Sequence, residues 1–269
     1  MKRFLVRFIR RNRNTLFFKQ VNRISSALSR ILNCEDDVGD FLRNGEYNLI
    51  KLLATEDCNG MLFFDVGANR GDCAQAWMHL TEMSRVYCFE IVRPTYEKLS
   101  DRFQGNLRAS CYPFGLSDTN METVVSYIPE SDSGSSLNVL PWQHEMKELP
   151  ALLKTGDSFV AESDINEIFF LKIDTEGHEL NVLRGFLSLI KKQKIKCIQF
   201  EYGYTYIQNR YFLKDVYELL ESAGYDLGRI YPEGVNFKEY DIFRDENFRM
   251  KNYFATCDPD IRKKVSWPR

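Results

Sequence analysis

The chain has 269 residues, 44% of them hydrophobic, which is enough for one domain with a sizeable core. Its net charge is −2, but residues 1–33 hold nine of the 36 Lys and Arg and none of the 38 Asp and Glu. The rest of the chain is therefore acidic. This argues against a general nucleic-acid binder, because neutralising phosphates requires clustered Lys and Arg.

The cysteines and histidines restrict the chemistry further. Seven cysteines form no C-x-x-C motif, and several lie in apolar, strand-like runs. Thiols in a reducing compartment are therefore predicted rather than disulfides, and the expected location is the cytoplasm. Three histidines without metal-ligand spacing argue against a structural zinc site.

The basic segment is expected to form an extension, residues 1–40, that precedes a folded domain, residues 41–269. Apolar residues recur in it at steps of four and three, as on one face of a helix: Phe17, Val21, Ile24, Leu28 and Ile31. Three interpretations stay open: a helix packed on the body, an interfacial helix in peripheral contact with the inner face of a membrane, or an organelle transit peptide. No run approaches the roughly 18 apolar residues of a spanning helix.

Beyond residue 44 the pattern alternates between helices and strands. We expect helices over 45–54, 72–82, 94–103, 177–191 and 212–223, and strands over 61–66, 86–90, 108–114, 121–128, 168–174 and 195–201. Late antiparallel strands are expected over 225–231, 240–243 and 252–257. The sequence thus predicts an α/β fold, with a doubly wound, mostly parallel, Rossmann-like sheet and a late antiparallel strand.

Two acidic segments punctuated by glycine stand out: Phe63–Asp72 and Phe170–Glu179. In each, a short apolar run ends in a carboxylate and a glycine turn, and a helical pattern follows. The carboxyl ends of parallel strands meet at one edge of a sheet, where open α/β folds bind their ligands. A binding site is therefore predicted at this edge.

The first segment argues against a dinucleotide. In a G-x-G-x-x-G turn the second glycine admits the pyrophosphate, and Asn69 occupies its place here. Asp65 suits an ammonium group, and Gly67 lets the chain pass close beneath a ligand. Glu90, which ends the next strand, suits the two hydroxyls of a ribose. An adenosyl group joined to an amino acid, as in S-adenosylmethionine, meets these requirements.

Five motifs resemble those of the FkbM-type S-adenosylmethionine-dependent methyltransferases in order and approximate spacing: FFDVGANRGD, VYCFEIVRPTYEKL, GLSD, FFLKIDTEGHELNVLRGF and IQFEYG. The resemblance covers about residues 45–257. It implies a class I methyltransferase fold with a seven-stranded sheet, and O-methylation of hydroxyls on sugars, polyketides or other secondary metabolites. One departure is Thr155-Gly156-Asp157, where members commonly have T-L-D, so the local strand geometry and the role of Asp157 stay open.

The resemblance also implies roles for single residues. The first strand and its turn would hold the methionine end, the second strand the ribose, the GLSD motif the adenine, and the KID motif the sulfonium. The implied cofactor-binding residues are Asp65, Gly67, Asn69, Glu90, Ser117, Asp118 and Asp174.

The second segment supplies candidates for catalysis. An alcohol acceptor has to lose a proton, which favours a nearby carboxylate or histidine. The predicted catalytic residues are Asp174, Glu176 and His178, whereas Glu179 is interpreted as a helix-start residue. No metal is expected, although a divalent cation on Asp174, Glu176 and Glu201 is an alternative. Lys172, inside the same strand, is interpreted as part of a buried ion pair or as a stem packed along the sheet, rather than as a catalytic residue.

Other features bear on the acceptor. Tyr202, Tyr204 and Tyr206 are interpreted either as a platform for a sugar or as ordinary packing. The serine-rich segment 131–136 is either a lid or a plain connection.

The favoured function is that of an S-adenosylmethionine-dependent methyltransferase. It would act by in-line transfer to a hydroxyl of a small molecule or glycan, such as a sugar or secondary metabolite. The alternatives are a methyltransferase-like protein that only binds its ligand, and an N-methyltransferase acting on a small amine. A basic segment at residues 1–33 would fit an enzyme working at an anionic membrane.

Overall fold

The chain was analysed as a computed structural model that describes residues 2–35, 39–54, 60–128 and 146–267. Eight strands form the central sheet: β1 (Leu62–Val66), β2 (Arg85–Phe89), β3 (Ala109–Tyr112), β7 (Ile168–Ile173), β8 (Ile195–Tyr202), β9 (Asp226–Tyr231), β10 (Gly234–Phe237) and β11 (Lys251–Thr256). Their order across the sheet is β10-β9-β11-β8-β7-β1-β2-β3.

The pairing confirms the predicted doubly wound, mostly parallel sheet. The neighbours β3, β2, β1, β7 and β8 pair in parallel. The order of strands reverses between β1 and β7: the chain first builds outward from β1 to β3, and then outward on the other side from β7 to β8. The late strand β11 runs antiparallel between β8 and β9, as expected. Strand β10 was not expected and adds an eighth strand, antiparallel to β9 at the edge.

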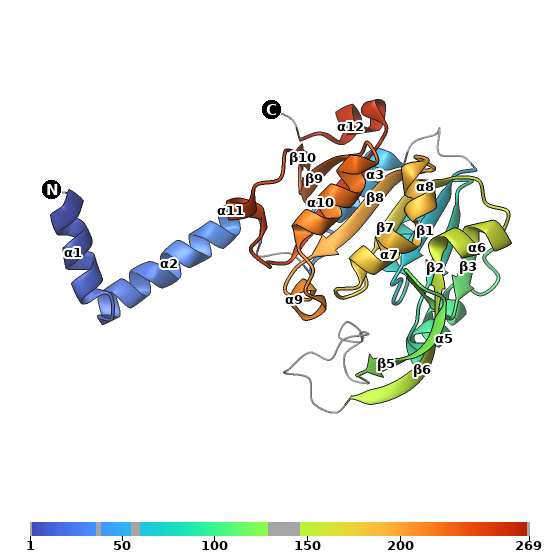
Figure 1. Cartoon of the computed structure of the whole chain (residues 1–269), viewed down its shortest axis with the longest axis horizontal. Coiled ribbons are helices and arrows are strands. Elements are labelled where there is room, and N and C mark those ends of the chain that lie inside the picture. The colour runs from blue at the N-terminus through green and yellow to red at the C-terminus, as the bar shows by residue number, and fades with distance from the viewer. Residues whose placement is uncertain (1, 36–38, 55–59, 129–145, 268–269) are drawn as a thin grey trace.

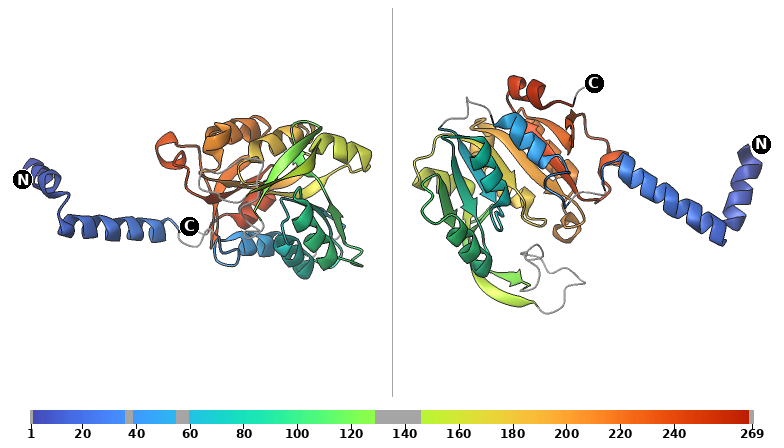
Figure 2. Two further views of the ribbon diagram at one scale, coloured as in Figure 1. Left: turned by 90° about the horizontal axis from the view of Figure 1, so that it is seen from below. Right: turned by 180° about the vertical axis from the view of Figure 1, so that it is seen from behind.

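Helices cover both faces of the sheet (Figures 1 and 2). One face carries α3 (Glu46–Leu53), α4 (Asp72–Leu80), α5 (Arg93–Arg102) and α12 (Pro259–Val265). The other carries α6 (Gly156–Glu162), α7 (Glu179–Gly185), α8 (Leu187–Lys191) and α10 (Leu213–Ser222).

Alternation along β1 explains how one strand serves both cores. Phe63 packs against Trp77 and Phe170 on the first face, and Phe64 packs against Phe159 and Phe186 on the second. Because side chains alternate along a strand, residues two apart share a face. Asp65 therefore lies on the same face as Phe63, the face that carries α3 and α4.

A second, smaller sheet lies beyond β3 (Figure 1). Its strands β4 (Gly115–Ser117), β5 (Met121–Tyr127) and β6 (Lys147–Thr155) take the order β4-β6-β5. Strand β5 matches the strand predicted over 121–128, and β6 was not predicted. The departure from T-L-D falls at Gly156, where a Cβ would overlap the ring of Phe186. Thr155 caps α6, since its Oγ1 accepts from the N–H of Ser158 (3.2 Å).

Asp157 has a structural role in the fold. Its carboxylate accepts the backbone N–H groups of Ser188 (2.9 Å) and Leu189 (3.2 Å) at the start of α8. Acids suit this positive end of a helix.

Two predicted elements were wrong in part. The single helix expected over 177–191 is divided into α7 and α8 at Phe186, which is fully buried. The strand expected over 240–243 is instead the short helix α11 (Ile242–Asp245), because Oδ1 of Asp241 accepts the N–H of Phe243 (2.9 Å) and starts a helical turn. The short helix α9 (Tyr206–Asn209) was also not predicted.

Two helices precede the body, α1 (Lys2–Asn12) and α2 (Leu16–Leu32), and both project away from it (Figures 1 and 2). Neither contains a buried residue, so the interpretation of a helix packed on the body does not hold for this structure. None of the helices in the described ranges is long and apolar enough to cross a membrane. Six of the cysteines are described, and all six are thiols, as predicted.

Close packing at Gly185 provides a test of the fold. A Cβ on Gly185 would lie 1.9 Å from the carbonyl oxygen of Ser117, where α7 meets β4. Gly185→Ala should lower the free energy of unfolding by about 1–3 kcal/mol through this overlap, although Ala normally favours a helix. Urea denaturation measures the change.

Gly39→Ala is the matched control, because a Cβ on Gly39 would meet no atom within 4 Å. Equal urea midpoints for the two variants would contradict the packing of α7 on β4.

Candidate active site

The two acidic segments meet at the carboxyl edge of β1 and β7, as predicted. The N–H of Asp174 donates to the carbonyl oxygen of Val66 (2.9 Å). Gly67 has a φ of +79°, and a Cβ on it would lie 1.8 Å from the carbonyl oxygen of Asp174. Only glycine therefore allows the two loops to touch.

Glu90 fixes the loop that follows β1. Its Oε2 accepts the N–H of Asn69 (3.0 Å) and its Oε1 accepts the N–H of Val92 (2.8 Å). Burial raises the pKa of Glu90 to about 7, against the effect of these two amides. Asn69 has a φ of +49°, a left-handed conformation that asparagine adopts more readily than most residues. Each carboxylate oxygen keeps a further lone pair for a ligand hydroxyl.

Asp65 is the most deeply buried acid of the first segment, with 1% exposure. No hydrogen bond of good geometry reaches either of its carboxylate oxygens. Burial raises its pKa to about 6, and the cation of Lys172, with Nζ 3.9 Å from Oδ1, acts in the opposite direction. The backbone N–H of Ala74 also acts to lower this pKa. A buried carboxylate that lacks hydrogen bonds of good geometry is unusual, because it carries a cost in free energy that a partner would remove.

Lys172 links the two segments. Its Nζ lies 2.9 Å from Oδ2 of Asp174 and 3.9 Å from Oδ1 of Asp65. Burial alone would lower the pKa of Lys172, but the two carboxylates outweigh it and raise the pKa well above its ordinary value. The predicted buried ion pair is confirmed. Asp174 is the open member of the group, with a side chain 41% exposed.

Glu46, in the first turn of α3, belongs to the same cluster and was missed in the sequence. It is 8% exposed and accepts hydrogen bonds from the side-chain amides of Asn44 (2.6 Å), Gln199 (2.5 Å) and Asn252 (3.0 Å). Burial raises the pKa of Glu46, and Lys172 partly offsets this. The only local feature of the sequence that marked Glu46 was its position as an acid at a helix start. Gln199, which donates to Glu46, is 153 residues away in the sequence.

The loop between β7 and α7 is strained and held by Glu179. Glu176 has a φ of +54°, and Gly177 has a φ of +101°. Oε1 of Glu179 accepts from the N–H and the hydroxyl of Thr175 (2.9 and 3.1 Å) and from the N–H of Gly177 (3.1 Å). Glu179 thus shapes the loop, which agrees with its interpretation as a helix-start residue.

Glu176 in this loop and Glu201 in β8 are two further partly buried carboxylates that interact with Asp174. Burial, reinforced by Asp174 and Glu179, raises the pKa of Glu176 to about 8. Burial also raises the pKa of Glu201 well above its ordinary value, with Asp174 and Glu176 adding to the effect. Within the described residues, no three or more His, Cys, Asp or Glu side chains are arranged to hold a metal ion.

His178 faces the GLSD motif. Its Nε2 lies 2.9 Å from Oγ of Ser117, which donates to Oδ1 of Asp118 (3.0 Å). Since a hydroxyl has one hydrogen, Nε2 of His178 carries the proton and Nδ1 is left as an acceptor. Burial lowers the pKa of His178 to about 4, although Asp118 opposes this, so the ring is neutral near pH 7.

The three tyrosines that follow Glu201 divide between core and surface. Tyr202 and Tyr206 are fully buried, and Tyr202 donates to Oε1 of Glu246 (2.8 Å). Tyr202 and Tyr206 are therefore packing residues. Of the three tyrosines, Tyr204 is the one that an acceptor could contact, because it is 38% exposed. The predicted lid, residues 131–136, lies outside the described residues.

The sheet order, the reversal between β1 and β7, and the acidic carboxyl edge define a Rossmann-like class I methyltransferase. The pattern of the methyltransferase FkbM domain matches residues 65–227. The chain belongs to this family and is a methyltransferase.

The chain is also similar to several known proteins. The hexuronic acid methyltransferase AglP of Haloferax volcanii is 27% identical over 184 residues, which are 66% of this chain and 69% of that protein. The crystal structure of methyltransferase FkbM from Methylobacillus flagellatus KT has 16% identity and a TM-score of 0.47. It matches 73% of this chain, which spans only 43% of that protein. Precorrin-6y C5,15-methyltransferase from Geobacter metallireducens GS-15 has 10% identity and a TM-score of 0.44, with 78% and 86% of the two chains covered.

The raised carboxylate pKa values make stability depend on pH. Glu90, Glu176 and Glu179 have pKa values of about 7, 8 and 7 in the folded chain, against an ordinary 4.5. Between about pH 6.5 and 8 the folded state retains protons that the unfolded state has lost, so the free energy of unfolding should fall as pH rises. Glu176→Gln should reduce this slope, because it removes one of the carboxyl groups that hold a proton in the folded chain at these pH values.

Chemical denaturation at a series of pH values measures the slope. Glu122→Gln, on the exposed side of β5, is the control and should retain the slope of the wild type. A slope in Glu176→Gln equal to that of the wild type would show that Glu176 is ionised in the folded chain.

Proposed function

We propose that this methyltransferase uses S-adenosylmethionine and methylates a hydroxyl group of a sugar or another small acceptor. The observation that carries the proposal is Asp65, a buried carboxylate with no hydrogen bond of good geometry, one strand away from Glu90, the acid suited to a ribose. A ligand with both an ammonium group and a ribose would satisfy both acids.

The cofactor fits the residues of the edge. Asp65 would accept from the ammonium group, and the loop at Gly67 and Asn69 would run beneath the methionine end. Glu90 would take the ribose hydroxyls with its remaining lone pairs. When bound, S-adenosylmethionine supplies a methyl group activated on a sulfonium.

Ser117 and Asp118 would lie beside the adenine. His178 donates to Ser117, so it positions this hydroxyl through its Nε2. Its Nδ1 is left as an acceptor toward a ligand.

Asp174 is our candidate for the general base. It is the more open carboxylate of the Lys172 pair, so an acceptor hydroxyl can reach it. Glu176, with a pKa of about 8, is largely protonated at pH 7 and is better suited to donate a hydrogen bond. His178, with a pKa of about 4, is a weak base whose Nε2 is engaged. Proton removal by Asp174 would raise the nucleophilicity of the acceptor oxygen.

A sugar acceptor is supported by the relative named a hexuronic acid methyltransferase. Residues 41–269 would form the catalytic domain, with the extension outside it.

Calorimetry with two ligands tests the cofactor site. Asp65→Asn should weaken binding of S-adenosylhomocysteine by about 10- to 100-fold, because a charged hydrogen bond is lost, but leave adenosine binding unchanged. Glu90→Gln should weaken both ligands, since both carry the ribose. Asp72→Asn is the control, as its side chain is 75% exposed and pairs with Arg102.

Two results would contradict this assignment. If the wild-type protein bound neither S-adenosylmethionine nor S-adenosylhomocysteine, the proposed cofactor would be wrong. Equal losses for adenosine and S-adenosylhomocysteine in Asp65→Asn would show that Asp65 does not contact the amino acid end.

Transfer of a labelled methyl group to hexuronic acids, neutral hexoses and primary amines tests the acceptor class. Label should appear on a sugar oxygen, and Asp174→Asn should lower kcat by about 100-fold through loss of the base. Glu122→Gln serves again as the control. Label on the amines alone would favour an N-methyltransferase, and cofactor binding without any transfer would favour a binding protein.

A further inference from the structure

Helix α1 has one apolar face and one basic face. Consecutive residues are about 100° apart around a helix, so its apolar side chains span an arc of about 200°. The apolar side chains, which are 39% to 77% exposed, are Phe4, Leu5, Val6, Phe8 and Ile9. The remaining arc carries four arginines: Arg3, Arg7, Arg10 and Arg11. Apart from Lys2 at the first position, the two kinds of side chain are thus segregated around the helix.

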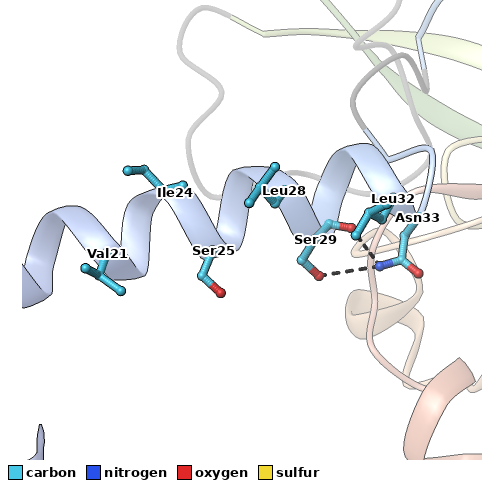
Figure 3. Close-up of a pocket in the computed structure, with 7 residues that line it drawn as sticks. All are labelled: Val21, Ile24, Ser25, Leu28, Ser29, Leu32 and Asn33. Carbon is cyan, nitrogen blue, oxygen red and sulfur yellow. Dashed lines mark hydrogen bonds between the residues drawn. The ribbon is translucent and has the colours of Figure 1, made fainter.

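Helix α2 repeats this arrangement. Its apolar face carries Phe17, Val21, Ile24, Leu28 and Ile31, which are 44% to 67% exposed. Lys19, Arg23 and Arg30 lie together on the opposite side. Figure 3 shows a shallow hollow along α2, and every residue that lines it comes from α2 and its C-cap.

The end of α2 is fixed to the body. Arg229 donates to the carbonyl oxygens of Asn33 and Cys34. Glu35 pairs with Arg249 (2.6 Å) and with Lys251 (3.7 Å). Lys251 is the register partner of Tyr202, at the carboxyl end of β8. The helices therefore leave the body at the same edge of the sheet as the candidate active site.

We propose that α1 and α2 form an interfacial anchor that lies on a lipid bilayer containing anionic lipids. The apolar faces would enter the boundary between headgroups and acyl chains, and the Lys and Arg side chains would contact anionic headgroups. Residues 1–33 contain nine basic residues and no acid, which complements such a surface. This inference does not rest on the proposed reaction.

A second copy of this chain is the less suitable occupant of these faces. Pairing two apolar faces of α1 would bring the flanking arginines of both copies together, and like charges at short distance repel. A bilayer with anionic headgroups meets the same arginines with the opposite charge. The charge pattern therefore favours the lipid surface.

Co-sedimentation of the full chain with vesicles tests the anchor. The protein should bind vesicles of phosphatidylcholine with about 30% phosphatidylglycerol at least about tenfold more tightly than phosphatidylcholine alone. Raising the salt concentration should weaken the binding, because the electrostatic part is screened.

Two double variants with the same change of charge test which face binds. Ile24→Glu with Leu28→Glu places two carboxylates on the apolar face and should weaken vesicle binding by about 100-fold. Asn22→Glu with Ser26→Glu places two carboxylates on the polar side of α2, with the same spacing, and should weaken it by about tenfold or less. All four positions are exposed, so both variants should unfold thermally as the wild type does.

Three results would overturn the proposal. The wild type could fail to bind anionic vesicles, or the two double variants could lose binding equally. Light scattering could instead show a dimer that only Ile24→Glu with Leu28→Glu dissociates, which would assign the face to a second copy. Binding to vesicles needs no methyl transfer, so a failure of the proposed function would leave this test unaffected.

Discussion

The ion pairs of Lys172 hold the functional edge together. The register of β1 and β7 places Asp65 beside Lys172, and Asp174 follows two residues later. A buried ammonium group is costly on its own, and these two carboxylates offset the cost. With Glu46 nearby, one cation faces three acids, so the cluster keeps an excess of negative charge in a buried place. A cationic ligand would neutralise this excess of negative charge. The register of β1 and β7, which brings these acids together, therefore also determines the charge of the ligand that the edge favours.

The carboxylates around this cluster divide by their partners. Glu90 and Glu179 accept backbone N–H groups and thereby shape the two loops. Neither oxygen of Asp65 accepts a hydrogen bond of good geometry, so this carboxylate is left for a ligand. The left-handed backbone at Glu176 costs about 1–3 kcal/mol. Three hydrogen bonds to one oxygen of Glu179 together contribute several kcal/mol, so they can hold the loop in this strained form.

The sequence predicted what depends on local patterns. Buried strands, glycine turns and strand-end acids are visible in single segments, and the two acidic loops meet as expected. The break at Phe186 was not visible, because the apolar period continues through it and only packing shows the change. Strand β6 carries Pro150 and no clear alternation, and it is stabilised by pairing with β5. Glu46 could not be found, because its partners Gln199 and Asn252 are brought to it only by the folded sheet.

Basic residues are concentrated in α1 and α2, whereas the carboxyl edge of the sheet, where the candidate active site lies, is acidic. An acid-rich site favours a cationic ligand, yet the same acids would repel an anionic surface. Repulsion in salt is screened beyond about 8 Å, so it acts only where the body comes close to that surface. Basic residues confined to α1 and α2 attract the surface without neutralising the site. If the same charges were mixed evenly over the chain, neither the acidic cluster nor the basic face would form, although the net charge of −2 would be the same.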